Sequence, residues 1–177
     1  AQAQEATPLP DIDLESADEQ RASSLSGERL SRPVIRSLQA GSSDTAKLLQ
    51  AVPGVSGFGA GGFSTLPVIH GLEAQRLNVL VDGLAIASAC PNDMNPPLSY
   101  TDPQTVRSIE VLTGVSRVSV GGDSIGGVIA VETAPPRFAA QGQTLLTGEA
   151  SAFYRSNGDG FGGALSVGIG EIANEAA

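Results

Sequence analysis

The amino-acid sequence predicts an α+β fold, in which a small mixed sheet with short helices is followed by long antiparallel strands. One observation behind this prediction is the region from about residue 40 to residue 136. There, a helical segment and several short apolar runs are separated by Gly, Pro and Asp residues. The other is a change after Arg137 to two segments of roughly ten residues that partly alternate between apolar and polar side chains. A chain of 177 residues is long enough for one well-buried domain and an added segment.

The charge balance argues against one class of partner. The chain has 10 Lys and Arg against 19 Asp and Glu, a formal net charge of −9, so we expect no binding to the phosphates of DNA or RNA. Its 22 Gly and 11 Pro indicate a loop-rich fold. Since no run of about 18 apolar residues is present, the sequence predicts no transmembrane helix.

The N-terminal segment, from Ala1 to about Arg32, is polar, acidic and without a regular period, which is typical of a flexible tail. Within it, the stretch "LPDIDLES" at residues 9–16 alternates apolar and polar side chains. Such a stretch is able to add as a strand to the edge of a partner's sheet. The other interpretation is chance alternation in a disordered tail, and the residues alone leave both open.

A short helix is expected within "SSDTAKLLQAVPGV". Ser43 or Asp44 provides an N-cap, because either side chain accepts a hydrogen bond from a free N–H group of the first turn. The helix should end at Val52, since the residue before a proline, here Pro53, avoids the helical region.

Three apolar runs bounded by turn residues predict strands of the small sheet: residues 77–81, 108–112 and 128–133. The pair Asp82-Gly83 directly after the first run favours a tight turn between extended segments. Asp102 as a cap and Pro103 as a first helical residue predict one helical turn before the second run.

The two segments after Arg137, "QTLLTGEASAFY" and "FGGALSVGIG", are separated by the turn residues "RSNGDG". Alternation assigns opposite faces of the first segment to two sets: Leu146, Ala150, Ala152 and Tyr154, and Thr147, Glu149 and Ser151. Alternating segments of this length are typical of outer-membrane barrel strands, apolar toward lipid and polar toward the lumen. Two such strands leave unpaired edges, so we expect a longer protein or a partner that supplies the missing strands.

A hydrolase motif is present only in part. "GDSIG" at residues 122–126 matches the G-x-S-x-G pattern with Ser124 in the nucleophile position, but the histidine base of that motif follows the serine in sequence. The only histidine, His70, precedes it. The sequence therefore favours a tight glycine turn over an enzyme. His70 itself is either an ordinary hydrogen-bonded residue beside a turn glycine or a metal ligand.

"SACPNDMNPP", residues 88–97, holds the only cysteine and the only methionine of the chain. Pro91 is suited to open a helical turn and Pro96 disfavours its continuation, so a single turn is expected that places Cys90 and Met94 on one side. A thiolate and a thioether are soft ligands that favour Cu(I). The alternative, which the spacing alone leaves equally open, is a buried cysteine beside a gap-filling methionine.

Residues 46–136 resemble the plug domain of TonB-dependent outer-membrane receptors. The segments "LLQAVPGV", "VIHGL", "RLNVLVDG" and "VRSIEVLTGVSRVSVGGDSIGGVIAVET" occur in the order and spacing of that family. His70 stands where most members have Arg, a departure that leaves the resemblance intact. The glycine-rich block fits the family pattern at a set of six residues: Gly122, Ile125, Gly126, Gly127, Val128 and Ile129.

The resemblance implies a plug inside a barrel of about 22 strands, in the outer membrane of a Gram-negative bacterium with lipid around the barrel. It divides the chain into a flexible periplasmic segment (residues 1–36), the plug (37–137) and the first strands of an incomplete barrel (138–177). It also implies that the N-terminal segment pairs with TonB by strand addition. The candidate for this TonB box is Pro10, Asp11, Ile12, Asp13 and Leu14. No catalysis is implied.

Within that family, "ACPNDMNPPLSY" is similar to the plug loop of the copper-transporting receptors. The resemblance implies that Cys90 and Met94 bind copper, preferably as Cu(I), together with ligands from the barrel. Copper is then the transported substrate, and its remaining ligands lie outside this sequence. The alternative function is uptake of a siderophore or another metal chelate, with Cys90 and Met94 serving only in packing.

Overall fold

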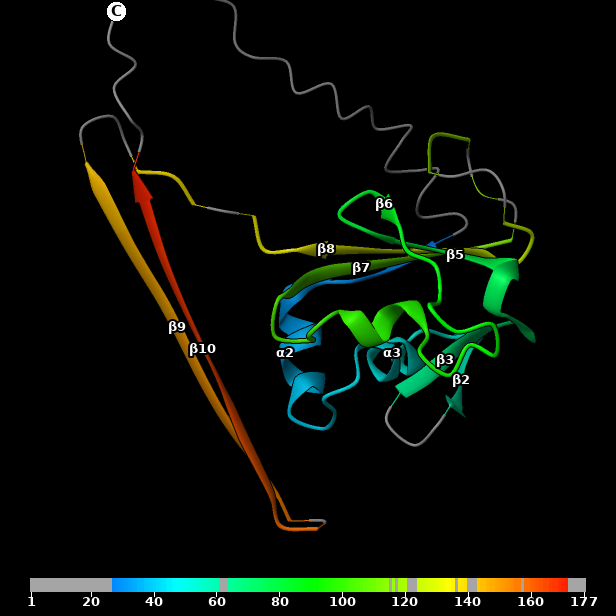
Figure 1. Cartoon of the computed structure of the whole chain (residues 1–177), viewed down its shortest axis with the longest axis horizontal. Helices are drawn as coiled ribbons and strands as arrows, with labels where there is room; N and C mark the ends of the chain where they lie inside the picture. The colour runs from blue at the N-terminus through cyan, green and yellow to red at the C-terminus, as the bar shows by residue number, and fades with distance from the viewer. Residues whose placement is uncertain are drawn as a thin grey trace, which may run out of the picture.

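The computed structural model describes residues 27–60, 64–114, 116, 118–120, 124–135, 137–139, 143–156 and 158–171. Its central feature is a five-stranded sheet in the order β1-β7-β8-β5-β6 (Figure 1). The strands are β1 (Gly27–Leu30), β5 (Leu77–Val81), β6 (Leu84–Ala85), β7 (Val106–Thr113) and β8 (Gly127–Thr133). Only β5 and β8 pair in parallel, so the sheet is mixed, as the sequence predicts.

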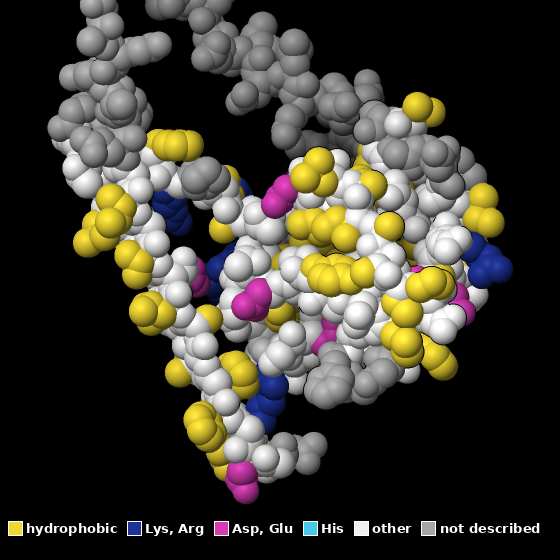
Figure 2. All heavy atoms as spheres, viewed as in Figure 1, with side chains coloured by type: hydrophobic (Ala, Val, Ile, Leu, Met, Phe, Trp, Pro, Cys, Tyr) yellow, Lys and Arg dark blue, Asp and Glu magenta, His cyan; other side chains and the backbone are white. Residues whose placement is uncertain are grey.

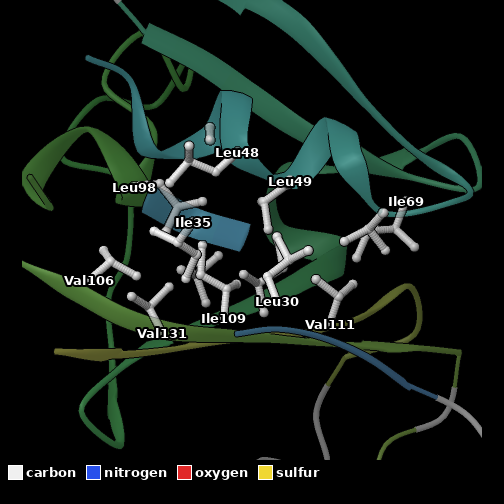
Figure 3. Close-up of a cluster of buried hydrophobic side chains, with 14 of the residues drawn as sticks. Leu30, Ile35, Leu48, Leu49, Ile69, Leu98, Val106, Ile109, Val111 and Val131 are labelled. Atoms are coloured by element: carbon white, nitrogen blue, oxygen red, sulfur yellow. The ribbon is translucent and has the colours of Figure 1, made fainter. Parts of the chain in front are cut away.

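One face of this sheet is covered by helices and by a smaller sheet (Figure 1). The helical elements are α2 (Arg32–Gln39), α3 (Thr45–Leu48) and the 3₁₀ turns η1 (Leu49–Ala51), η2 (Ala74–Arg76), η3 (Pro97–Tyr100) and η4 (Val118–Val120). The smaller sheet has the order β2-β3-β4, with strands Val55–Ala60, Ser64–Ile69 and Leu72–Glu73. Apolar side chains fill the space between the layers (Figure 3), among them the fully buried Ile35, Leu49, Leu98, Ile109 and Ile129.

The predicted helix is confirmed in α3 and the 3₁₀ turn η1 that continues it. Asp44, rather than Ser43, is the N-cap, since its carboxylate accepts a hydrogen bond of 3.0 Å from the N–H group of Ala46. The helical path ends at Val52, whose N–H group bonds to the Leu49 carbonyl at 2.9 Å, directly before Pro53. The cap residue and the proline are therefore sufficient to predict where this helical segment begins and ends.

The predicted turns are present, one of them in a different form. Asp82 and Gly83 have φ angles of 50° and 80°, and this pair of left-handed residues gives the tight hairpin between β5 and β6. Asp102 accepts a hydrogen bond of 2.8 Å from the Gln104 N–H group. The segment after Asp102 is a hydrogen-bonded turn and not a helix, and β7 begins at Val106, two residues earlier than predicted.

The prediction of a flexible segment up to about Arg32 is wrong for residues 27–32. Strand β1 pairs antiparallel with β7 from Gly27↔Leu112 to Leu30↔Ile109, and α2 begins at Arg32. A strand of four residues with one buried apolar side chain, Leu30, is too short to show a period in the sequence. Helix α2 crosses the division predicted at residue 36, and the candidate TonB box lies outside the described residues.

The two long strands after Arg137 are confirmed as β9 (Thr144–Arg155) and β10 (Gly160–Glu171), which pair antiparallel along their whole length. They form a hairpin beside the mixed-sheet domain (Figure 1), and hydrophobic side chains follow its outer side (Figure 2). This outer row has exposed fractions of 62–87% and consists of Leu146, Tyr154, Phe161, Leu165, Val167 and Ile169. The inner face of β9 carries polar groups that contact the mixed-sheet domain, including Glu149 and Ser151. None of the described helices has the length and apolar character needed to cross a membrane.

Candidate functional site

The loop of residues 86–97 connects β6 with η3 and is fixed at both ends. At its start, the Ile86 N–H group donates to the Val79 carbonyl of β5 at 2.9 Å. At its end, the Ser99 N–H group donates to the Pro96 carbonyl at 2.9 Å, and Leu98 is fully buried in the core. The position of the loop is therefore determined by the hydrophobic core of the mixed-sheet domain.

Cys90 and Asp93 close a turn inside this loop. The Asp93 N–H group donates to the Cys90 carbonyl at 2.9 Å, and Asp93 has a φ of 51°. A turn is present after Cys90, but it is not the helical turn expected from Pro91, because the left-handed Asp93 interrupts a right-handed helix before Met94. Cys90 is half-buried, whereas the side chain of Met94 is 51% exposed.

Two serines hold the backbone on either side of the Cys-Met pair. The Ser88 hydroxyl lies 3.1 Å from the Cys90 carbonyl and 3.0 Å from the Asn95 carbonyl, and it accepts from the Cys90 N–H group at 3.4 Å. The Ser64 hydroxyl, at the start of β3, donates to the Met94 carbonyl at 3.2 Å. The loop is thus pre-organised by contacts that the sequence analysis did not identify. The only sequence signal was a serine two residues before Cys90.

A hollow of about 560 Å³ lies between the loop and the two sheets. Cys90 and Asp93 line this hollow, and Met94 is not among its lining residues. The walls are mainly apolar and come from β3, η2, β5, β6 and the loop: Leu66, Pro67, Ala74, Gln75, Leu77, Asn78, Val79, Ala85, Ile86, Ala87, Ser88, Ala89, Cys90, Pro91, Asp93 and Pro97. A mainly apolar hollow with a few polar groups is the usual character of a small-molecule site.

Within the described part of the chain, no group of three or more His, Cys, Asp and Glu side chains is placed to hold a metal ion. Among the described residues, the loop thus contains two sulfur side chains, Cys90 and Met94, without a cluster of hard or borderline ligands to accompany them.

The other two candidate residues occupy structural positions. His70 (φ 49°) and Gly71 (φ 83°) form the turn between β3 and β4, and the His70 N–H group donates to the Gly54 carbonyl at 3.0 Å. Its imidazole lies against Gly54, where an added Cβ would come within 2.4 Å of Nε2. Ser124 is 6% exposed, and its hydroxyl has no hydrogen-bond partner among the described residues. A buried hydroxyl without a base is not arranged as a nucleophile.

Comparison with known proteins identifies the family of this architecture. Residues 19–128 match the family model of the TonB-dependent Receptor Plug Domain. The curated relatives include a vitamin B12 transporter, BtuB, from Photobacterium profundum, 29% identical over 129 residues and 72% of this chain. They also include a hemin receptor from Yersinia pestis, 32% identical over 145 residues and 73% of this chain. The chain spans 21% of the length of each relative.

Solved structures agree with this match. The copper transporter OprC has a TM-score of 0.62 and 29% identity, over 82% of this chain and 21% of that protein. The ferric enterobactin receptor PfeA from Pseudomonas aeruginosa has a TM-score of 0.60 over 88% of this chain and 24% of its own, and its 18% identity supports the fold alone. Since the family match covers more than half of the chain, this chain belongs to the TonB-dependent receptors and comprises a plug domain with the first strands of the barrel.

Proposed function

We propose that the whole protein is a TonB-dependent receptor of a Gram-negative outer membrane that takes up a metal ion or a metal chelate. The family match, the plug fold and the lipid-type outer row of the β9–β10 hairpin support this proposal. The relatives named above are described as transporters or receptors of vitamin B12, hemin, copper and ferric enterobactin. Each of these cargoes is a metal ion or contains a metal ion bound to an organic ligand.

The finer proposal is that the cargo is copper, captured as Cu(I) by Cys90 and Met94. The observation that carries it is the pre-organised loop of residues 86–97, in which hydrogen bonds from Ser88 and Ser64 fix the carbonyls of both sulfur residues. A loop that is already ordered loses little conformational entropy on binding a ligand. The 29% identity to the copper transporter OprC supports the same assignment.

Capture requires coordination and no covalent change of the cargo. Cys90 binds as the thiolate, so a proton leaves its sulfur when the metal arrives. Met94 adds a neutral thioether, and two sulfurs from the plug leave room for barrel ligands to complete the shell. Since Met94 is 51% exposed, it is accessible to a metal that enters from outside the plug.

TonB is the proposed periplasmic partner. The candidate contact is the box from Pro10 to Leu14, an alternating stretch suited to strand addition. It precedes β1 by fewer than 20 residues, so the N-terminal segment continues directly into an edge strand of the plug sheet. A periplasmic N-terminus follows from this proposed contact.

A second candidate cargo is a metal chelate, with Cys90 and Met94 in packing roles. The observation in its favour is the hollow of about 560 Å³ with mainly apolar walls, a volume within the range of small-molecule sites. No comparable observation supports an enzyme, because the chain belongs to a family of receptors and Ser124 is buried.

The test is a titration of the full-length receptor with Cu(I) under reducing conditions. Cys90→Ala and Met94→Leu are compared with wild type, and Met94→Leu separates metal ligation from packing because it keeps the volume and removes the sulfur. Loss of one ligand should weaken Cu(I) binding by about tenfold or more. Equal Cu(I) affinity in all three proteins would contradict the copper proposal and leave the chelate cargo as the explanation.

A further inference from the structure

The two sulfur side chains of the loop lie in different surroundings. Cys90 is half-buried and lines the hollow of about 560 Å³ between the loop and the two sheets. Met94 is 51% exposed and is not among the residues that line this hollow. Two sulfurs that bind one metal ion lie no more than about 4.6 Å apart, since a metal–thiolate bond is about 2.3 Å long. Capture of one ion by both residues therefore requires Met94 to turn to the side of Cys90.

One backbone residue separates the pair from a helical arrangement. The Cys90 carbonyl accepts a hydrogen bond of 2.9 Å from the Asp93 N–H group. In a helical turn, the same carbonyl accepts from the Met94 N–H group, and positions 90 and 94 then share one face. Asp93 has a φ of 51°, and it is the only residue of the loop, residues 86–97, with a positive φ. The direction of the Met94 side chain is therefore set by the backbone of Asp93.

The conformation of Asp93 is able to change while the rest of the loop stays in place. A left-handed backbone is unfavourable for residues with a Cβ atom, although Asp and Asn tolerate it better than most. The loop is held independently of Asp93, by the hydrogen bond from Ile86 to Val79 at one end and by the fully buried Leu98 at the other. The hollow on the Cys90 side offers space for the Met94 side chain.

We propose that Asp93 is the positioning residue of the metal site. When Cu(I) binds to Cys90, the backbone of Asp93 passes from the left-handed to the right-handed region, and the turn is extended by one residue. Met94 then reaches the metal from the side of the hollow. We call this change the Asp93 switch. The inference rests on the proposed capture of Cu(I) and adds the residue that determines whether the two sulfurs act together.

The switch makes metal affinity depend on the backbone preference of residue 93. The apparent dissociation constant equals the intrinsic constant divided by the fraction of protein in the binding-competent conformation. Glycine adopts the left-handed region freely and therefore favours the open loop. Alanine disfavours that region and is the best helix former, so it favours the closed loop. Neither residue has a carboxylate, so opposite effects of the two substitutions report the backbone and not the charge.

The test is a Cu(I) titration of the full-length receptor with substitutions at Asp93. Asp93→Gly should weaken binding by about three- to tenfold, and Asp93→Ala should strengthen it by about three- to tenfold. Asp93→Asn is the conservative variant, which tolerates the left-handed region and should retain the affinity of wild type. The matched control is Asp159, which has a φ of 50° in the turn between β9 and β10. Asp159→Gly and Asp159→Ala should leave Cu(I) affinity unchanged.

A second measurement follows the switch without metal. Met94→Cys places a second thiol in the loop, and dibromobimane becomes fluorescent only when it bridges two thiols. Bridging requires the side chains at positions 90 and 94 to approach each other, as metal capture does. The fluorescence should therefore appear about three- to tenfold faster when Met94→Cys is combined with Asp93→Ala than when it is combined with Asp93→Gly. The double variant Cys90→Ala with Met94→Cys measures the background.

The Asp93 switch is refuted by equal Cu(I) affinities of Asp93→Gly and Asp93→Ala in a receptor whose wild type binds Cu(I). Weaker binding in all three Asp93 variants also refutes it, because that result assigns the carboxylate as a metal ligand. Absence of Cu(I) binding in every protein counts against the copper proposal. The bridging rates then test the switch alone, and equal rates in the Asp93→Ala and Asp93→Gly proteins refute it.

Discussion

The plug and the β9–β10 hairpin place the same kinds of side chain in opposite environments. In the plug, Ile35, Ile109 and Ile129 are fully buried between a sheet and its helices. In the hairpin, the apolar row faces outward, with Leu165 78% and Phe161 87% exposed, and the polar row faces the plug. The plug therefore has an apolar core and a surface suited to water, whereas the outer face of the hairpin is suited to lipid.

The largest effect is expected from a cavity in the plug core. Ile109→Ala removes a fully buried side chain and should lower the free energy of unfolding by about 2–5 kcal/mol, the range for large-to-small changes in a core. The matched control is Leu165→Ala in the hairpin, where an exposed side chain is shortened without leaving a cavity. Urea unfolding of the full-length receptor in detergent measures both. Equal losses would contradict the contrast between the two regions.

A charged residue on the outer row should destabilise the hairpin more than a charged residue on the inner face of the same strand. Leu165→Arg places a guanidinium toward lipid and should cost about 2–4 kcal/mol if the residue lies near the bilayer midplane. Ser166→Arg, at the next residue and on the opposite face, should cost much less. The measurement is unfolding of the receptor from lipid vesicles. A larger loss for Ser166→Arg would show that the assigned faces are reversed.

The fold was predictable where its determinants are local. The cap of α3, the Asp82-Gly83 hairpin and the alternation of β9 each depend on residues a few positions apart. Strand β1 was missed because its pairing with β7 joins residues about 80 positions apart in the chain and only Leu30 of its four residues is buried. Propensity and period contain no information on such a partner.

The candidate site also has features that local sequence predicts and features that it does not. Cys90 and Met94 stand out in the sequence because each is the only residue of its kind, and the turn between them follows from the prolines. The left-handed Asp93, which ends that turn and lines the hollow with Cys90, has no sequence signal that distinguishes it from other loop aspartates. The contact between α2 and β9 was also beyond sequence reasoning, since Arg36 and Glu149 are 113 residues apart.

The smallest effects are expected from the loss of one hydrogen bond in each region. In the plug, the Thr45 hydroxyl, on a residue that is 1% exposed, donates to the Thr101 carbonyl. Thr45→Val keeps the shape and deprives that carbonyl of its donor, so a loss of about 1–3 kcal/mol is expected. In the hairpin, the Tyr154 hydroxyl donates to Asp159 at 2.8 Å across the turn, and Tyr154 is 66% exposed. Tyr154 is one residue from the end of β9, where aromatic residues of barrel strands meet the membrane–water interface, so water replaces the lost partner and Tyr154→Phe should cost less than about 1 kcal/mol. Urea unfolding of the two single variants measures the loss of free energy of unfolding in each. A larger loss for Tyr154→Phe would mean that the hairpin turn is more enclosed in the whole receptor than its exposed fraction indicates.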